Sequence, residues 1–281
     1  MFKRILIVIV VIFLVFLGIE QKKEQKHAIS VFGSSLTSPV SKRISEIYKK
    51  DHKQLLVLKT DEDKKIMEQI ETGDVDVGVV SILSGRDEKS PKLNYLNLGF
   101  DAMVFIVNAE NPIEKIDGSM ILDIYTKKIK NWKDVSDWDK RIFICSEKSG
   151  NSLSSLFEQY FGLKNPGQPK NKPGEYISQD THITGSPLET VSFVADMPGA
   201  IGFTSLSTVV YLKQQGVRVK ILPFDGVKPT QENILSNKYP ATIELDVVYK
   251  KEQQNIQDFL KVCTYPEVRN ILKELNFVTA K

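Results

Sequence analysis

Apolar strands alternate with amphipathic helices along the chain from residue 28 onward, and no other feature of the sequence limits the fold as strongly. Two parallel strands need a long crossover between them, usually a helix, so this alternation predicts an α/β protein with sheets flanked by helices. The expected strands cover residues 28–32, 54–59, 75–80, 96–107, 142–144, 217–222 and 245–249, and the expected helices cover 39–50, 64–71, 119–125, 187–195, 255–264 and 266–275. With 281 residues, the chain is long enough for one large core or for two lobes of ordinary domain size.

Two short turns rich in serine and glycine each lead from an expected strand into an expected helix. The first covers residues 33–38 and precedes a helix that Pro39 opens, and the second covers 146–151 and precedes a helix with Leu153 and Leu156 in its apolar stripe. Backbone N–H groups and the positive end of the helix dipole gather at such helix starts, so the two turns together predict a site for a small oxyanion. The alternative is that their polar side chains only cap the helices.

The N-terminus consists of a basic start, an apolar run and a polar cluster. Lys3 and Arg4 precede an uninterrupted apolar run at 5–19, and the polar cluster follows at 21–26. This pattern is typical of a secretory signal, and the run is short for a membrane span. We therefore expect an exported, extracytoplasmic protein, in the periplasm or at the outer face of the cell membrane. Residues 1–27 are expected to form either a cleaved signal peptide or an N-terminal membrane anchor plus a short stalk.

Composition and spacing argue against several other functions. The net charge is only +3, from 38 Lys+Arg and 35 Asp+Glu, so we expect no nucleic-acid binding. The three histidines lack metal-ligand spacing, and we expect neither a metal nor a cofactor. Cys145 and Cys263 are expected to be buried free thiols, with a disulfide between them as the alternative. Neither Ser35 nor Ser149 lies in a Gly-x-Ser-x-Gly elbow, so we expect no enzyme activity.

Six short motifs occur in the order in which one known family carries them. They are residues 33–39, 73–78, 121–125 with 129–132, 149–152, 198–203, and 226–234 with Tyr239 and Pro240. On these motifs, and over nearly all of the chain from about Ala28 onward, the sequence resembles the phosphate ABC transporter substrate-binding proteins, which are type II periplasmic binding proteins. The resemblance implies an α/β two-lobe fold in which each lobe is a mostly parallel sheet flanked by helices, with a two-strand hinge.

The same resemblance implies a division of the chain and a set of partners. Lobe I is expected at 28–103 and 247–281, and lobe II at 104–246. The implied partners are phosphate or a similar oxyanion, bound between the lobes, and the permease subunits of an ABC transporter. The chain is expected to be a monomer, and an uncleaved N-terminal segment would attach it to the membrane.

The resemblance also places the ligand contacts. The position of a carboxylate that accepts the phosphate proton in many members falls on Ser81, a threonine of the family's second turn is replaced by Asn151, and the position of the family's arginine falls on Cys145. Lys148 or, as the poorer candidate, Arg141 could supply the missing positive charge. The expected ligand-binding residues are therefore Ser35, Leu36, Ser81, Lys148, Ser149, Gly150 and Asn151.

An acidic run at 61–63 stands where the family has a loop rich in Gly and Ser. Two interpretations stay open: the three carboxylates stabilise a solvated helix start, or they face the ligand and repel an anion. The sequence therefore predicts a solute-binding protein that captures phosphate or a related small oxyanion for an ABC importer. The alternative is a membrane-tethered sensor or scaffold of the same fold, with altered or lost ligand binding.

Overall fold

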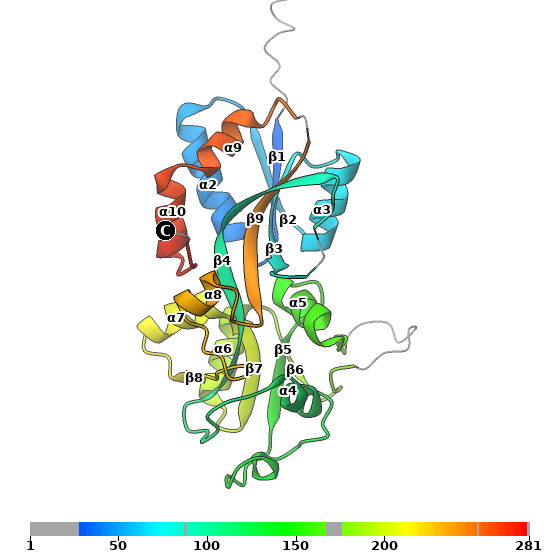
Figure 1. Cartoon of the computed structure of the whole chain (residues 1–281), viewed down its shortest axis with the longest axis vertical. Coiled ribbons are helices and arrows are strands. Elements are labelled where there is room, and N and C mark those ends of the chain that lie inside the picture. The colour runs from blue at the N-terminus through cyan, green and yellow to red at the C-terminus, as the bar shows by residue number, and fades with distance from the viewer. Residues whose placement is uncertain (1–27, 87–88, 167–175, 252, 280–281) are drawn as a thin grey trace, which may run out of the picture.

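The computed structural model describes residues 28–86, 89–166, 176–251 and 253–279 and shows two lobes stacked along the long axis (Figure 1). The strands are β1 Ile29–Gly33, β2 Leu56–Thr60, β3 Val77–Leu83, β4 Leu93–Asn108, β5 Phe143–Glu147, β6 His182–Thr184, β7 Ala200–Ser205, β8 Val219–Ile221 and β9 Thr242–Lys250. The helices are α2 Ser38–Asp51, α3 Asp63–Thr72, α4 Gly118–Tyr125, the 3-10 helix η1 Trp132–Asp134, α5 Ser152–Phe161, α6 Pro187–Asp196, α7 Leu206–Gln214, α8 Gln231–Leu235, α9 Gln257–Cys263 and α10 Pro266–Glu274.

The strands follow the order β2-β1-β3-β9-β4-β7-β5-β6, and β8 pairs with β4 outside this path. Parallel pairs lie in both lobes: β1 pairs with β2 and β3, and β5 pairs with β6 and β7. Antiparallel pairs join these two groups through the long strands β4 and β9. The α/β two-lobe fold expected from the sequence is confirmed.

Strand β4 belongs to both lobes. Its first part, from Leu93 to Ala102, pairs with β9, and its second part, from Met103 to Val107, pairs with β7. Tyr239, just before β9, is fully buried and donates a hydrogen bond of 3.0 Å from its hydroxyl to the carbonyl of Met103. The expected lobe boundaries at 103/104 and 246/247 fall inside β4 and β9, and they stay a prediction.

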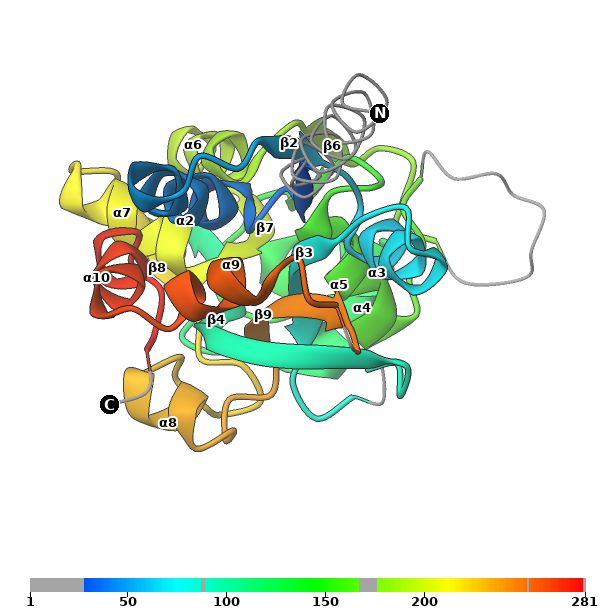
Figure 2. The same cartoon turned by 90° about the horizontal axis from the view of Figure 1, so that it is seen from above.

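Helices cover both faces of the sheet in each lobe. In the upper lobe of Figure 1, α2, α9 and α10 lie on one side of the sheet and α3 on the other, and the view from above shows the same arrangement (Figure 2). The first side is filled by residues such as Ile44 and Phe259, and the second by Ile66 and Ile70, which pack with Val80 of β3. In the lower lobe, α6 and α7 face α4 and α5 across β5 and β7. The turns that lead into α2 and α5 therefore come from different lobes.

Three elements of the structure were not expected from the sequence, namely strand β6 and helices α7 and α8. Both cysteines are buried free thiols, as expected. The signal or anchor expected at 1–27 lies outside the described residues. Within the described residues, no helix has the length and apolar character that crossing a membrane requires.

Candidate functional site

The first turn is built rigidly between β1 and α2. The backbone N–H of Ser34 donates to the Thr37 hydroxyl at 2.9 Å, and that hydroxyl donates to the carbonyl of Val79 in β3. Ser34 and Thr37 are fully buried, whereas Ser35 is exposed. The turn thus holds its own polar groups inside the lobe and presents Ser35 outward.

Ser35 meets the beginning of α5 in the other lobe. The backbone N–H of Ser152 donates to the Ser35 hydroxyl oxygen at 2.8 Å, and the Ser35 hydroxyl donates to that of Ser152 at 3.1 Å. The backbone N–H of Leu36 lies 3.4 Å from the Ser152 hydroxyl, and the Leu36 side chain joins the hydrophobic cluster of the lower lobe. The first turn and the start of α5 therefore face each other, and the two lobes are in direct contact here.

The second turn places its residues in different directions. Gly150 has a φ of +88°, the left-handed region that favours glycine. Asn151 is buried, and its amide donates at 3.1 Å both to Oε2 of Glu147 and to the carbonyl of Gly185. The Asn151 side chain therefore points into the lower lobe. Lys148 and Ser149 are exposed.

Ser81 lies at the same interface and is paired with Asp63. The backbone N–H of Ser81 donates to Oδ1 of Asp63 at 2.7 Å, and the Ser81 hydroxyl donates to the same oxygen at 3.0 Å. Burial raises the pKa of Asp63, and hydrogen bonds from Ser81, Ser152 and Ser34 partly oppose this rise. Asp63 thus brings a carboxylate to the place where the two turns meet.

The acidic run is not simply a solvated helix start. Glu62 forms an ion pair with Lys65 at 2.7 Å, and Asp61 accepts a hydrogen bond from the Glu62 N–H at 2.9 Å. A side-chain carbon on Gly150 would lie 3.0 Å from Oε1 of Glu62, so this carboxylate borders the second turn. The interpretation as a solvated start is wrong for Asp63, because its carboxylate turns inward toward Ser81.

Positive charge is scarce around the two turns. Cys145 is buried, and burial raises the pKa of its thiol to about 12, so the thiol stays protonated. Arg141 is exposed and interacts with Asp180 at 3.7 Å and with the Phe143 ring. Within the described parts of the chain, no Lys, Arg or His forms an ion pair with Asp63. An anion held here would depend on neutral hydrogen-bond donors.

Glu147 is a second buried carboxyl group, directly below the second turn. It is 1% exposed, and burial raises its pKa to about 7, which the Asn151 hydrogen bond partly opposes. Its other oxygen, Oε1, has no hydrogen-bond partner among the residues described. Such a group ionises at a cost in the interior, so it is largely neutral only below neutral pH.

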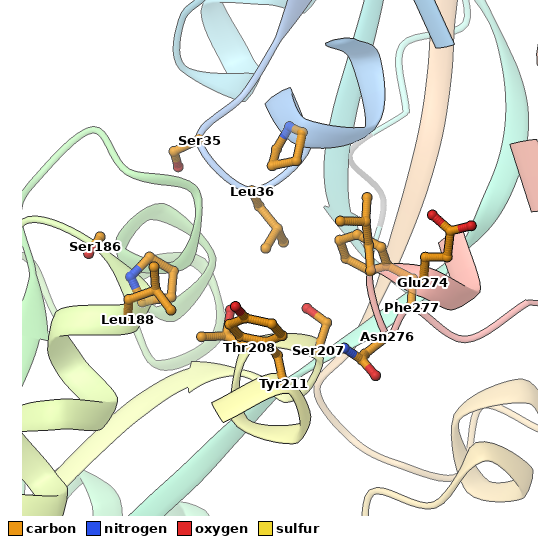
Figure 3. Close-up of a pocket in the computed structure, with 13 residues that line it drawn as sticks. Ser35, Leu36, Ser186, Leu188, Ser207, Thr208, Tyr211, Glu274, Asn276 and Phe277 are labelled. Atoms are coloured by element: carbon orange, nitrogen blue, oxygen red, sulfur yellow. The ribbon is translucent and has the colours of Figure 1, made fainter. Parts of the chain in front are cut away.

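A pocket of about 410 Å³ lies beside the first turn (Figure 3). Leu36 enters it from the upper lobe, Leu188 and Tyr211 from the lower lobe, and Phe277 from the C-terminal segment. Neither Asp63 nor the second turn lines this pocket. Its mostly hydrophobic wall suits the packing of the lobes better than the binding of a small anion.

In the part of the chain that the structure describes, no cluster of three or more His, Cys, Asp or Glu side chains could hold a metal ion.

The structure therefore unites Ser35, Leu36 and Ser81 with two residues that were not expected, Ser152 and Asp63. Ser152 closes the motif 149–152, so that motif was the available signal. Asp63 was visible in the acidic run, but sequence spacing does not tell which of three successive carboxylates points inward. No sequence pattern indicated that Glu147 is buried, because its burial depends on the position of β5 in the folded protein.

Known proteins share this fold and parts of the sequence. The phosphate-binding protein PstS of Bacillus subtilis is 27% identical over 176 residues, 62% of this chain and 53% of its own length. The phosphate-binding protein PstS of Borreliella burgdorferi is 28% identical over 185 residues, 65% of this chain and 64% of its own. The chain thus spans only about half to two thirds of these relatives.

Structural similarity covers more of the chain than sequence similarity does. An ABC-type phosphate transport receptor from Vibrio cholerae superposes with a TM-score of 0.76 and 19% identity, over 90% of this chain and all of that one. These relatives are binding proteins rather than enzymes. A family model described as a PBP superfamily domain matches residues 20–267, and with its two lobes and facing turns the chain belongs to the PBP superfamily of periplasmic binding proteins.

Proposed function

We propose that this protein is the extracytoplasmic solute-binding component of an ABC importer and that it captures phosphate or a related small oxyanion between its lobes. The names of the relatives support the solute class. The observation that carries the proposal is the direct contact of Ser35, in the first turn, with Ser152 at the beginning of α5. Hydroxyl and N–H donors from both lobes gather there, and two helix starts add their positive dipole ends.

In this proposal, closure of the lobes surrounds the solute with donors. Ser35 and the N–H of Leu36 bind it from the upper lobe, and Ser149 and the N–H of Gly150 bind it from the lower lobe. Ser81 completes the site, and Lys148 lends charge from the exposed side. Asn151 orients the second turn through its bonds to Glu147 and Gly185 instead of touching the solute. Dry, oriented donors discriminate anions by geometry and protonation state.

The remaining parts of the proposal concern partners and location. The chain acts as a monomer, delivers its solute to the permease subunits, and uses no cofactor. It works outside the cytoplasm, either free or attached to the membrane through its N-terminal segment. Genes for a permease and an ATPase next to the gene for this protein would support the transport role.

Calorimetry on the full chain tests the solute. Titration with phosphate is expected to give saturable heat, and Ser35→Ala is expected to weaken binding about tenfold, because it removes one donor and acceptor from the interface. Ser236→Ala is the matched control, since Ser236 is exposed and far from both turns in the sequence. Oxyanion binding would be contradicted if neither the wild type nor a variant with separated lobes released or absorbed heat with millimolar phosphate or sulfate.

A second function is favoured by one observation: the carboxylate of Asp63 lies between the turns without a paired cation among the residues described. A sensor or scaffold that keeps the fold and does not bind oxyanions would tolerate such a carboxylate. The same titrations distinguish the two functions, because the solute-binding protein gives saturable heat as the wild type, whereas the sensor or scaffold gives none.

A further inference from the structure

Asp63 connects parts of the molecule that are distant in sequence. It begins α3, and its Oδ1 accepts hydrogen bonds from the N–H and the hydroxyl of Ser81 at 2.7 and 3.0 Å. Hydrogen bonding from Ser152, at the beginning of α5 in the other lobe, and from Ser34 of the first turn also lowers the pKa of this carboxyl group, and the Ser152 N–H itself donates to Ser35 of the first turn at 2.8 Å. One carboxylate thus touches β3, the first turn and the opposite lobe.

The surroundings of Asp63 are those of a bound anion. Its partners are three hydroxyl groups and one backbone N–H, all of which can donate, and two helices begin beside it. A surface acid at a helix start would instead face water or a lysine, as Glu62 does with Lys65. The carboxylate of Asp63 therefore has the contacts that a small oxyanion would make in the same place.

The polar contact between the two turns involves the same few groups. Ser152 donates its N–H to Ser35, accepts from the Ser35 hydroxyl at 3.1 Å, and shares its own hydroxyl with Asp63. The Ser152 hydroxyl therefore links the first turn to the carboxylate. Removal of the carboxylate would leave these donors without their charged acceptor and weaken the contact between the lobes.

We propose that Asp63 is an internal ligand of the oxyanion site: its carboxylate holds the lobes closed when no solute is bound, and a solute enters only by displacing it. The displacement half of this inference rests on the proposed function, whereas the closure half does not. An internal competitor lowers the apparent affinity for the solute, because the solute can bind only to the fraction of molecules in which the site is free. Asp63 thereby sets the solute concentration at which the protein responds.

Hydrogen exchange measures closure without any solute. In phosphate-free buffer, Asp63→Ser in the full chain is expected to speed the exchange of amides in peptides covering 34–38 and 149–155 about tenfold, because the lobes separate. Asp63→Asn keeps the shape and one acceptor and should give a smaller increase. Glu68→Gln removes a negative charge from the exposed side of the same helix and should change nothing. Circular dichroism confirms that each variant is folded.

Calorimetry with inorganic phosphate measures displacement. Asp63→Ser is expected to bind phosphate at least about tenfold more tightly than the wild type, and Glu68→Gln is expected to match the wild type. Unchanged exchange in Asp63→Ser would overturn the inference, even if phosphate binds, and would leave the proposed function standing. Faster exchange without phosphate or sulfate binding would support the internal closure while contradicting the proposed solute.

Discussion

Glu147 shows at the scale of one residue how burial changes chemistry. The group lies in the lower lobe with its pKa raised to about 7, whereas the same carboxyl in the unfolded chain has its ordinary value near 4.5. The folded state therefore binds a proton more tightly than the unfolded state does. Stability from this group is fully present below the unfolded pKa and is lost as the pH rises through the folded pKa.

Glu147→Gln tests this pH dependence. Between about pH 4.5 and pH 7 the wild type is expected to lose about 3 kcal/mol of unfolding free energy through this group, and Glu147→Gln is expected to lack that part of the slope. Urea unfolding at several pH values measures it, with Glu68→Gln as the exposed control. Equal slopes in Glu147→Gln and the wild type would show that Glu147 is ionised in the folded protein at neutral pH.

Residues of the site were predictable to different degrees. Ser35 and Leu36 follow from the turn that ends β1, because the backbone N–H groups at a helix start have no partner within the helix. The inward direction of Asp63 and Asn151 was not predictable, because it depends on partners that are distant in sequence or placed by the fold, Ser81 for Asp63 and Gly185 for Asn151. The Gly185 carbonyl reaches Asn151 only after β6 has paired with β5, and Ser152 reaches Asp63 only after the two lobes have come together.

At the scale of elements, the turn between α6 and β7 is fixed by close backbone packing. A side-chain carbon on Gly199 would lie 2.2 Å from the carbonyl oxygen of Arg141, and the Gly199 carbonyl accepts hydrogen bonds from Trp132 at 3.0 Å and from the Phe143 N–H at 3.1 Å. No side chain fits there unless the backbone moves. Gly199 therefore holds β7 against β5 and η1.

Gly199→Ala is expected to destabilise the protein by more than about 2 kcal/mol, because the clash is with backbone that cannot move alone. Gly118→Ala at the beginning of α4 is the matched control, since its nearest side-chain contact would be at an ordinary 3.9 Å. Thermal unfolding of the two variants measures the difference. A similarly small loss of stability in both variants would mean that the loop before β5 moves to make room for the new side chain at little cost in free energy.

Periodicity predicted most clearly the long helices with an apolar side, such as α2 and α10. Strand β6 has only three residues, so it has no measurable alternation. Helix α7 starts directly at the end of β7, where Ser205 caps it without an intervening Gly or Pro, so no turn signal separates the two elements. Short elements of this kind depend on tertiary contacts.

At the scale of the whole molecule, closure of the lobes combines a polar contact and an apolar one. Ser35 and Ser152 supply the polar contact, next to Asp63, and Leu36 supplies the apolar one by packing into the hydrophobic cluster of the lower lobe, where it is 7% exposed. The resemblance predicted two lobes from the sequence. It could not predict which polar groups meet between the lobes, because sequence spacing does not tell that Asp63 of the acidic run turns inward toward Ser81.

A double-mutant cycle tests whether the two contacts act together. Leu36→Ala in the wild type is expected to cost about 2 kcal/mol of unfolding free energy, because a buried side chain is truncated. In an Asp63→Ser background the lobes are already apart and Leu36 is more exposed, so the same truncation should cost less than about 1 kcal/mol. Leu55→Ala, at a position that is 67% exposed, should cost under about 0.5 kcal/mol in both backgrounds. Equal costs of Leu36→Ala in the two backgrounds would mean that the lobes stay closed without Asp63.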